Sequence, residues 1–110
     1  MNFDPHSVVK VPFPFTDRHA QKQRPALILS TGDFGKRSGH SVMAMITSAK
    51  HSAWPLDIEI TDLAAAGLPS PCLVRMKLFT LDHRLVLGQI GRLSAQDRQS
   101  VSEALSLLLS

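Results

Sequence analysis

The sequence predicts a small, mainly β domain, a curled sheet or barrel that ends in one helix. Two observations lead to this prediction: many short apolar segments are separated by polar turns, and helical periodicity is confined to the C-terminus. A third is size, since 110 residues with 44% hydrophobic residues are enough for one core. We therefore expect a single domain over residues 1–110.

Six segments have the composition of short strands. Residues 8–15 and 55–60 alternate with a period of two, which in the second segment turns Asp57 and Glu59 outward. Residues 41–47 are apolar on both phases, which indicates a central strand. The last two segments are joined by the polar turn 82–84 and are expected to form a hairpin. The six are residues 8–15, 25–29, 41–47, 55–60, 73–81 and 85–90.

Two helical segments follow from capping signals. Asp62 is expected to start a short turn that Gly67 ends, and residues 94–97 fit a capping box that opens a helix reaching the C-terminus. That helix carries more leucine than one buried face needs, so Leu107 and Leu109 are expected either to be exposed or to help form a dimer. Residues 16–23 and 30–39 are polar and read as exposed loops.

Composition limits the possible partners, cellular location and cofactors of the protein. The net charge of +3 is a mild basic excess that is compatible with a polyanionic partner but does not require one. Cys72 is the only cysteine, which excludes an internal disulfide and suits the cytoplasm. No apolar run approaches the ~18 residues that span a bilayer, so no membrane partner is expected. The five histidines lack metal-ligand spacing, so we expect neither a metal nor a cofactor.

Arg24 stands directly before Pro25 at the start of an apolar segment. The residue before proline is held in extended geometry, and a fixed guanidinium is a suitable ligand for an oxyanion. From these residues alone, a solvated or salt-bridged strand end is the better interpretation. Thr47 and Ser48 close another strand and either orient a phosphate or bond the next turn.

Arg75 and Lys77 lie two apart in an apolar strand and therefore project from one face. They indicate either a phosphate-binding face or an edge strand protected by charge. His19 lies in the basic loop before Arg24 and is able to titrate near neutral pH, although an ordinary exposed histidine is the simpler interpretation.

In order along the chain, "VVKVPFPFTD", "RPALILS", "MITSA", "PLDIEITDLAAAGLPSPCLVRMKLFTLD" and "IGRLS" resemble the PemK/MazF family of type II toxin-antitoxin toxins. The resemblance implies a mainly β fold with a C-terminal helix, an SH3-like small β-barrel of the PemK/MazF/CcdB toxin type. It also implies a homodimer that cuts single-stranded RNA without metal. A cognate antitoxin would block the RNA groove. The protein would contact DNA only indirectly, through that antitoxin.

Position by position, the resemblance assigns Arg24 and Thr47 as catalytic residues. Ser48, Arg75 and His19 are further candidates for catalysis or phosphate contact. The residues expected to bind RNA are Arg18, Lys22, Lys36, Arg37, Lys50, His51 and Lys77.

The expected reaction is attack of the ribose 2′-hydroxyl on the adjacent phosphorus, which gives a 2′,3′-cyclic phosphate and a 5′-hydroxyl. One departure matters: Lys77 stands where some members carry an acidic residue, and Ala20 to Gln23 contain none either. The alternative is therefore a non-catalytic toxin of the same fold that binds a protein target such as a topoisomerase.

Overall fold

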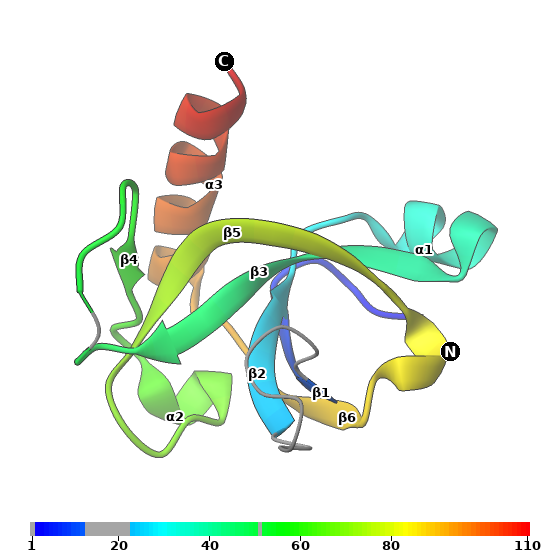
Figure 1. Cartoon of the computed structure of the whole chain (residues 1–110), viewed down its shortest axis with the longest axis horizontal. Coiled ribbons are helices and arrows are strands. Elements are labelled where there is room, and N and C mark those ends of the chain that lie inside the picture. Colours follow the sequence, from blue (N-terminus) through cyan, green and yellow to red (C-terminus); the bar gives the residue numbers. More distant parts are fainter. Residues whose placement is uncertain (1, 13–22, 51) are drawn as a thin grey trace.

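A computed structural model describes residues 2–12, 23–50 and 52–110 of the chain (Figure 1). Its centre is a curled, antiparallel six-stranded sheet in the order β4-β5-β3-β2-β1-β6. The strands are β1 (Ser7–Pro12), β2 (Gln23–Ile28), β3 (His40–Ser48), β4 (Ile58–Glu59), β5 (Cys72–Asp82) and β6 (Gly88–Arg92). The helices are α1 (Gly32–Ser38), α2 (Leu63–Ala66), α3 (Ala95–Leu109) and the 3-10 turn η1 (His83–Leu85). The predicted mainly β class, curled sheet and C-terminal helix are confirmed.

The sheet buries side chains on both faces. One apolar cluster contains Val8, Leu27 and Ile46 and continues into α2 and α3. A second contains Val9, Val11 and neighbours on β2 and β3. This arrangement explains why β1 is apolar at adjacent positions. Of the alternation predicted for residues 8–15, the part at 13–15 lies outside the described residues.

The predicted hairpin between the last two strands is wrong. β6 pairs with β1 instead, with Ser7 opposite Arg92. The turn η1 begins with His83, whose ring is buried and whose Nε2 lies 2.7 Å from the Ser41 Oγ. Anchoring this turn on β3 carries the chain away from β5 and across to the opposite edge, which curls the sheet.

The predicted loop at residues 30–39 contains a helix. The Thr31 Oγ1 accepts a hydrogen bond from the Phe34 amide at 3.1 Å, and Gly39 ends α1 with φ of 72°. Both are standard caps, but a seven-residue helix has too few turns to show a clear apolar stripe. The predicted strand at 55–60 is also shorter, because only Ile58–Glu59 pairs with β5.

Both capping predictions are confirmed. Asp62 caps α2, and Gly67 ends it in the left-handed region with φ of 72°. Ser94 caps α3 by accepting from the Asp97 amide at 3.2 Å. Leu107 and Leu109 on α3 are exposed, and no helix of the described residues is long and apolar enough to cross a membrane.

Candidate active site

Arg24 and Thr47 lie on neighbouring strands at the same level. In the β2–β3 ladder Ala26 is opposite Met45 and Leu27 is opposite Ala44. Continued by two residues, this register places Arg24 opposite Thr47. Opposite residues of an antiparallel pair project from one face, so both side chains lie on the side of the sheet that carries Ala26 and Met45. We call this side the Arg24 face.

Two features hold the backbone of Arg24 in place, the proline that follows it and the pairing of β2 with β1. Pro25 favours extended geometry at Arg24, and on the other edge of β2 Arg24 is opposite Val11 of β1. Arg24 is half-buried, and its Nε atom is shielded from solvent. Thr47 is buried at the end of β3, opposite Leu73. The two residues therefore combine a fixed guanidinium with a hydroxyl from the adjacent strand.

Arg75 shares the Arg24 face but is engaged within the protein. It lies opposite Met45, and a bulge in β5 follows it. Its Nε donates to Asp57 Oδ1 at 3.1 Å, and its Nη2 donates to Asp57 Oδ2 at 2.9 Å and to the Ser52 carbonyl. The hydrogen bond from the Arg75 side chain lowers the pKa of Asp57. Contrary to the alternation-based prediction, Asp57 is not turned toward solvent, because the 52–57 segment folds over Arg75.

The two hydrogen bonds from Arg75 to Asp57, which we call the Arg75–Asp57 clamp, also position Trp54. Its backbone amide donates to Asp57 Oδ2 at 3.0 Å, and the Asp57 amide donates to the Trp54 carbonyl at 3.2 Å. The Lys77 Nζ lies 4.4 Å from the indole centroid, and the Arg75 Cζ lies 5.9 Å from it. Arg75 and Lys77 therefore both lie beside the Trp54 ring. Sequence analysis missed Trp54, although the single tryptophan in a polar segment was a usable signal.

The other predicted residues are spread over the molecule. Ser48 projects from the opposite face to Thr47, and its Oγ accepts from the Lys50 amide at 3.2 Å, which is the strand-end bonding left open above. Lys36 and Arg37 lie in the last turn of α1, beyond the other end of β3 from Thr47 (Figure 1). Four predicted residues lie outside the described residues: Arg18, His19, Lys22 and His51.

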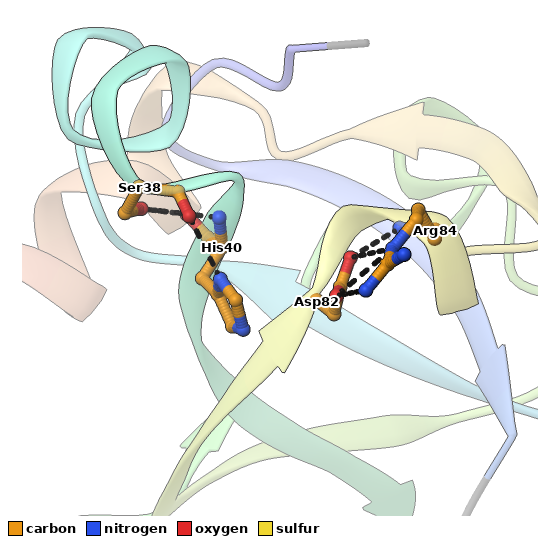
Figure 2. Close-up of polar contacts among 4 residues, drawn as sticks. All are labelled: Ser38, His40, Asp82 and Arg84. Atoms are coloured by element: carbon orange, nitrogen blue, oxygen red, sulfur yellow. Dashed lines mark hydrogen bonds and ion pairs between the residues drawn. The ribbon is translucent and has the colours of Figure 1, made fainter.

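A second polar cluster lies at that far end of β3, where Figure 2 shows Ser38 beside His40 and Asp82 beside Arg84. The His40 Nδ1 is 2.9 Å from the Ser38 carbonyl, and Arg84 Nη2 donates to Asp82 Oδ2 at 2.7 Å. The hydrogen bonds from Arg84 lower the pKa of Asp82. A pocket of about 520 Å³ here is lined by Asn2, Gly35, Lys36, Ser38, Gly39, His40, Asp82, His83 and Arg84.

Metal ligands are not grouped in the part of the chain that is described. Across residues 2–12, 23–50 and 52–110, no three His, Cys, Asp or Glu side chains are placed to hold one ion. Cys72 is buried, and burial raises the pKa of its thiol. Among the described residues, the polar groups on or beside the Arg24 face include the guanidinium of Arg24, the hydroxyl of Thr47 and the ammonium of Lys77.

Three solved structures match this chain over nearly its whole length. The MazE-MazF (Form-II) structure from Deinococcus radiodurans has a TM-score of 0.77 at 21% identity, covering 100% of this chain and 97% of that one. Mycobacterium tuberculosis toxin MazF-mt6 has a TM-score of 0.73 at 22% identity, covering 92% and 93%. An endoribonuclease in complex with its cognate antitoxin, from a mycobacterial species, has a TM-score of 0.74 at 14% identity, covering 98% and 93%.

A search of curated proteins finds no match. These structural likenesses show the fold, and the family follows from a separate comparison. The family model described as "PemK-like, MazF-like toxin of type II toxin-antitoxin system" matches residues 4–109, which is nearly the whole chain. This chain therefore belongs to the PemK-like, MazF-like family of type II toxin-antitoxin toxins.

Proposed function

We propose that this protein is a toxin that cuts single-stranded RNA at specific sequences without a metal ion. The observation that carries the proposal is the register of β2 and β3, which, continued by two residues, places Arg24 opposite Thr47 on one face of the sheet. Those are the two positions that family resemblance assigns to catalysis. Structural neighbours named as an endoribonuclease and as MazF toxins support the same activity.

RNA brings its own nucleophile to this reaction. The ribose 2′-oxygen forms a bond to the adjacent phosphorus, and the bond from phosphorus to the 5′-oxygen of the next nucleotide breaks. One proton leaves the 2′-oxygen and one reaches the 5′-oxygen, so the products are a 2′,3′-cyclic phosphate and a 5′-hydroxyl. The protein then has to align these atoms and stabilise charge on the phosphoryl oxygens. Dependence on the 2′-hydroxyl selects RNA over DNA.

The position of each described residue indicates its role in this reaction. Arg24 holds the phosphoryl charge, because its planar guanidinium fork matches two phosphate oxygens. Thr47 donates its hydroxyl to a phosphate oxygen from the adjacent strand. Arg75 is already committed to Asp57 and Ser52, so among the described cations the exposed Lys77 and Lys50 are better suited to flanking phosphates.

The same proposal includes a protein partner, an oligomeric state and a cellular location. Neighbours crystallised as MazE-MazF complexes support a cognate antitoxin for this chain, bound over the RNA-binding face. We expect a homodimer, which the exposed Leu107 and Leu109 suit. An mRNA substrate places the activity in the cytoplasm.

Incubation of the purified protein with mixed-sequence single-stranded RNA in EDTA tests this function. Mass spectrometry of the fragments should find cyclic-phosphate ends. The Arg24→Ala variant should cleave about 100- to 1000-fold more slowly, as expected for loss of one oxyanion ligand. Arg92→Ala is the matched control, since Arg92 lies on β6 and its Nη1 is 3.6 Å from Asp4 Oδ2. RNA left intact by the wild-type protein, while its expression still arrests the host, would instead support the non-catalytic toxin.

A further inference from the structure

We propose that Trp54 is a stacking platform for one unpaired base of the RNA, held beside the catalytic pair by the Arg75–Asp57 clamp. The inference rests on the proposed function, because it names RNA as the ligand. It adds a residue that binds substrate through a base, and it gives Arg75 a positioning role in place of direct phosphate contact.

The first observation is an exposed aromatic ring on a backbone that is held at two points. Trp54 is 41% exposed, an uncommon state for so large an apolar side chain in a segment with little regular structure. Its backbone is bonded at both its amide and its carbonyl by Asp57. Asp57 is in turn held by two hydrogen bonds from the buried guanidinium of Arg75. Because this backbone is already ordered, the segment loses little conformational freedom when a ligand stacks on the ring.

The second observation is the charge beside the ring. Lys77 places its Nζ 4.4 Å from the indole centroid and is itself exposed. A single-stranded nucleic acid presents a flat base and, next to it, a phosphate. Proteins that bind such strands combine aromatic stacking with a positive groove along the backbone. Trp54 and Lys77 supply this pair, which fits a nucleotide better than an apolar peptide side chain.

The third observation is position. Arg75 lies opposite Met45, two residues before Thr47 on β3, which corresponds to about 7 Å along the strand. The Arg75 Cζ lies 5.9 Å from the indole centroid. The platform therefore adjoins the Arg24 face, about two residues along β3 from the level of the catalytic pair. A base stacked there would belong to a nucleotide close to the scissile phosphate.

Intrinsic fluorescence gives a direct test, because the chain has one tryptophan and no tyrosine. The probe is a single-stranded RNA carrying a cleavage sequence of the protein, with 2′-O-methyl groups that prevent the reaction. Its titration should quench Trp54 emission. A series with one abasic nucleotide moved along the same strand should abolish quenching at one position only. Binding of every strand is measured independently by anisotropy of a dye at the RNA end.

Variants add a second readout. Trp54→Ala should weaken binding of the uncleavable RNA by about 5- to 150-fold, the range for loss of one base–aromatic stack, whereas Trp54→Phe should keep most of the affinity. With the strand that is abasic at the critical position, wild type and Trp54→Ala should bind alike. Phe34→Ala is the matched control, because Phe34 is 42% exposed on α1 at the far end of β3 and should leave binding unchanged.

The outcomes separate the two proposals. Cleavage with cyclic-phosphate ends, together with unquenched Trp54 emission and full affinity of Trp54→Ala, would overturn the platform and leave the endoribonuclease intact. Absence of cleavage by the wild-type protein would overturn the proposed function itself. Quenching that is the same for every abasic strand would show a general change near the ring and would also reject base stacking.

Discussion

Two arginine–aspartate pairs lie at opposite ends of β5 and have similar hydrogen bonds but different surroundings. Arg75 and Asp57 are joined at 2.9 Å with side chains that are 9% and 14% exposed. Arg84 and Asp82 are joined at 2.7 Å, but the Arg84 side chain is 89% exposed (Figure 2). The contact distances are similar, so they do not distinguish the roles of the pairs.

The difference lies in what each pair connects. Asp82 and Arg84 are two residues apart, and their pairing fastens only the turn in which both stand. Asp57 and Arg75 are separated by 18 residues, and their pairing holds the 52–57 segment and Trp54 to the sheet. Water screens the first pair and is largely excluded from the second. A buried pair with a distant partner is therefore the one expected to matter for stability and for the site.

Removal of Asp57 should have the largest effect. Asp57→Ala leaves the buried Arg75 guanidinium without its counterion and removes the acceptor of the Trp54 amide. We expect the free energy of unfolding to fall by about 3 kcal/mol, the lower part of the range for a broken buried pair. Urea unfolding followed by circular dichroism measures it. Asp82→Ala is the matched control, and an equal loss in both variants would contradict the distinction between the pairs.

Replacement of Arg75 by lysine should have an intermediate effect. Lysine keeps the positive charge but lacks the fork that reaches both oxygens of Asp57. Loss of one or two of these hydrogen bonds should cost about 1–2 kcal/mol of unfolding free energy. Trp54 emission should also shift to longer wavelength in the folded variant as its segment loosens. An Arg75→Lys protein with wild-type stability and emission would show that charge alone holds the segment.

Acid should weaken the buried pair. The Arg75 hydrogen bond lowers the pKa of Asp57 in the folded state, so its stabilisation is complete above the unfolded pKa of about 4 and is lost as pH falls through the lower folded value. Melting temperatures between pH 7 and pH 3 should therefore fall more steeply for wild type than for Asp57→Asn. Parallel curves for the two proteins would remove Asp57 from the acid response.

Features that depend on neighbouring residues were predicted from the sequence better than contacts between distant residues. The caps at Asp62 and Ser94 were predictable because each depends on residues within three positions. The partner of β6 was not, since it depends on contacts between residues far apart in the sequence, such as that of the buried His83 with Ser41. For the site, the family resemblance assigned Arg24 and Thr47 to catalysis, whereas the residues alone favoured a solvated strand end at Arg24. The alternation of residues 55–60 predicted that Asp57 points outward. This prediction was wrong because no local pattern shows that the irregular segment folds back over Arg75.

The smallest effect is expected at the exposed pair. Arg84→Ala removes a guanidinium that is almost wholly in water, where ion pairs often contribute nothing measurable. Its melting temperature should match wild type at 0.15 M salt. Any difference seen at low salt should vanish as salt rises, because screening acts on exposed charges first. A loss for Arg84→Ala that persists at 1 M salt would show that the pair fastens η1 to the sheet, and that exposure alone does not separate the two arginines.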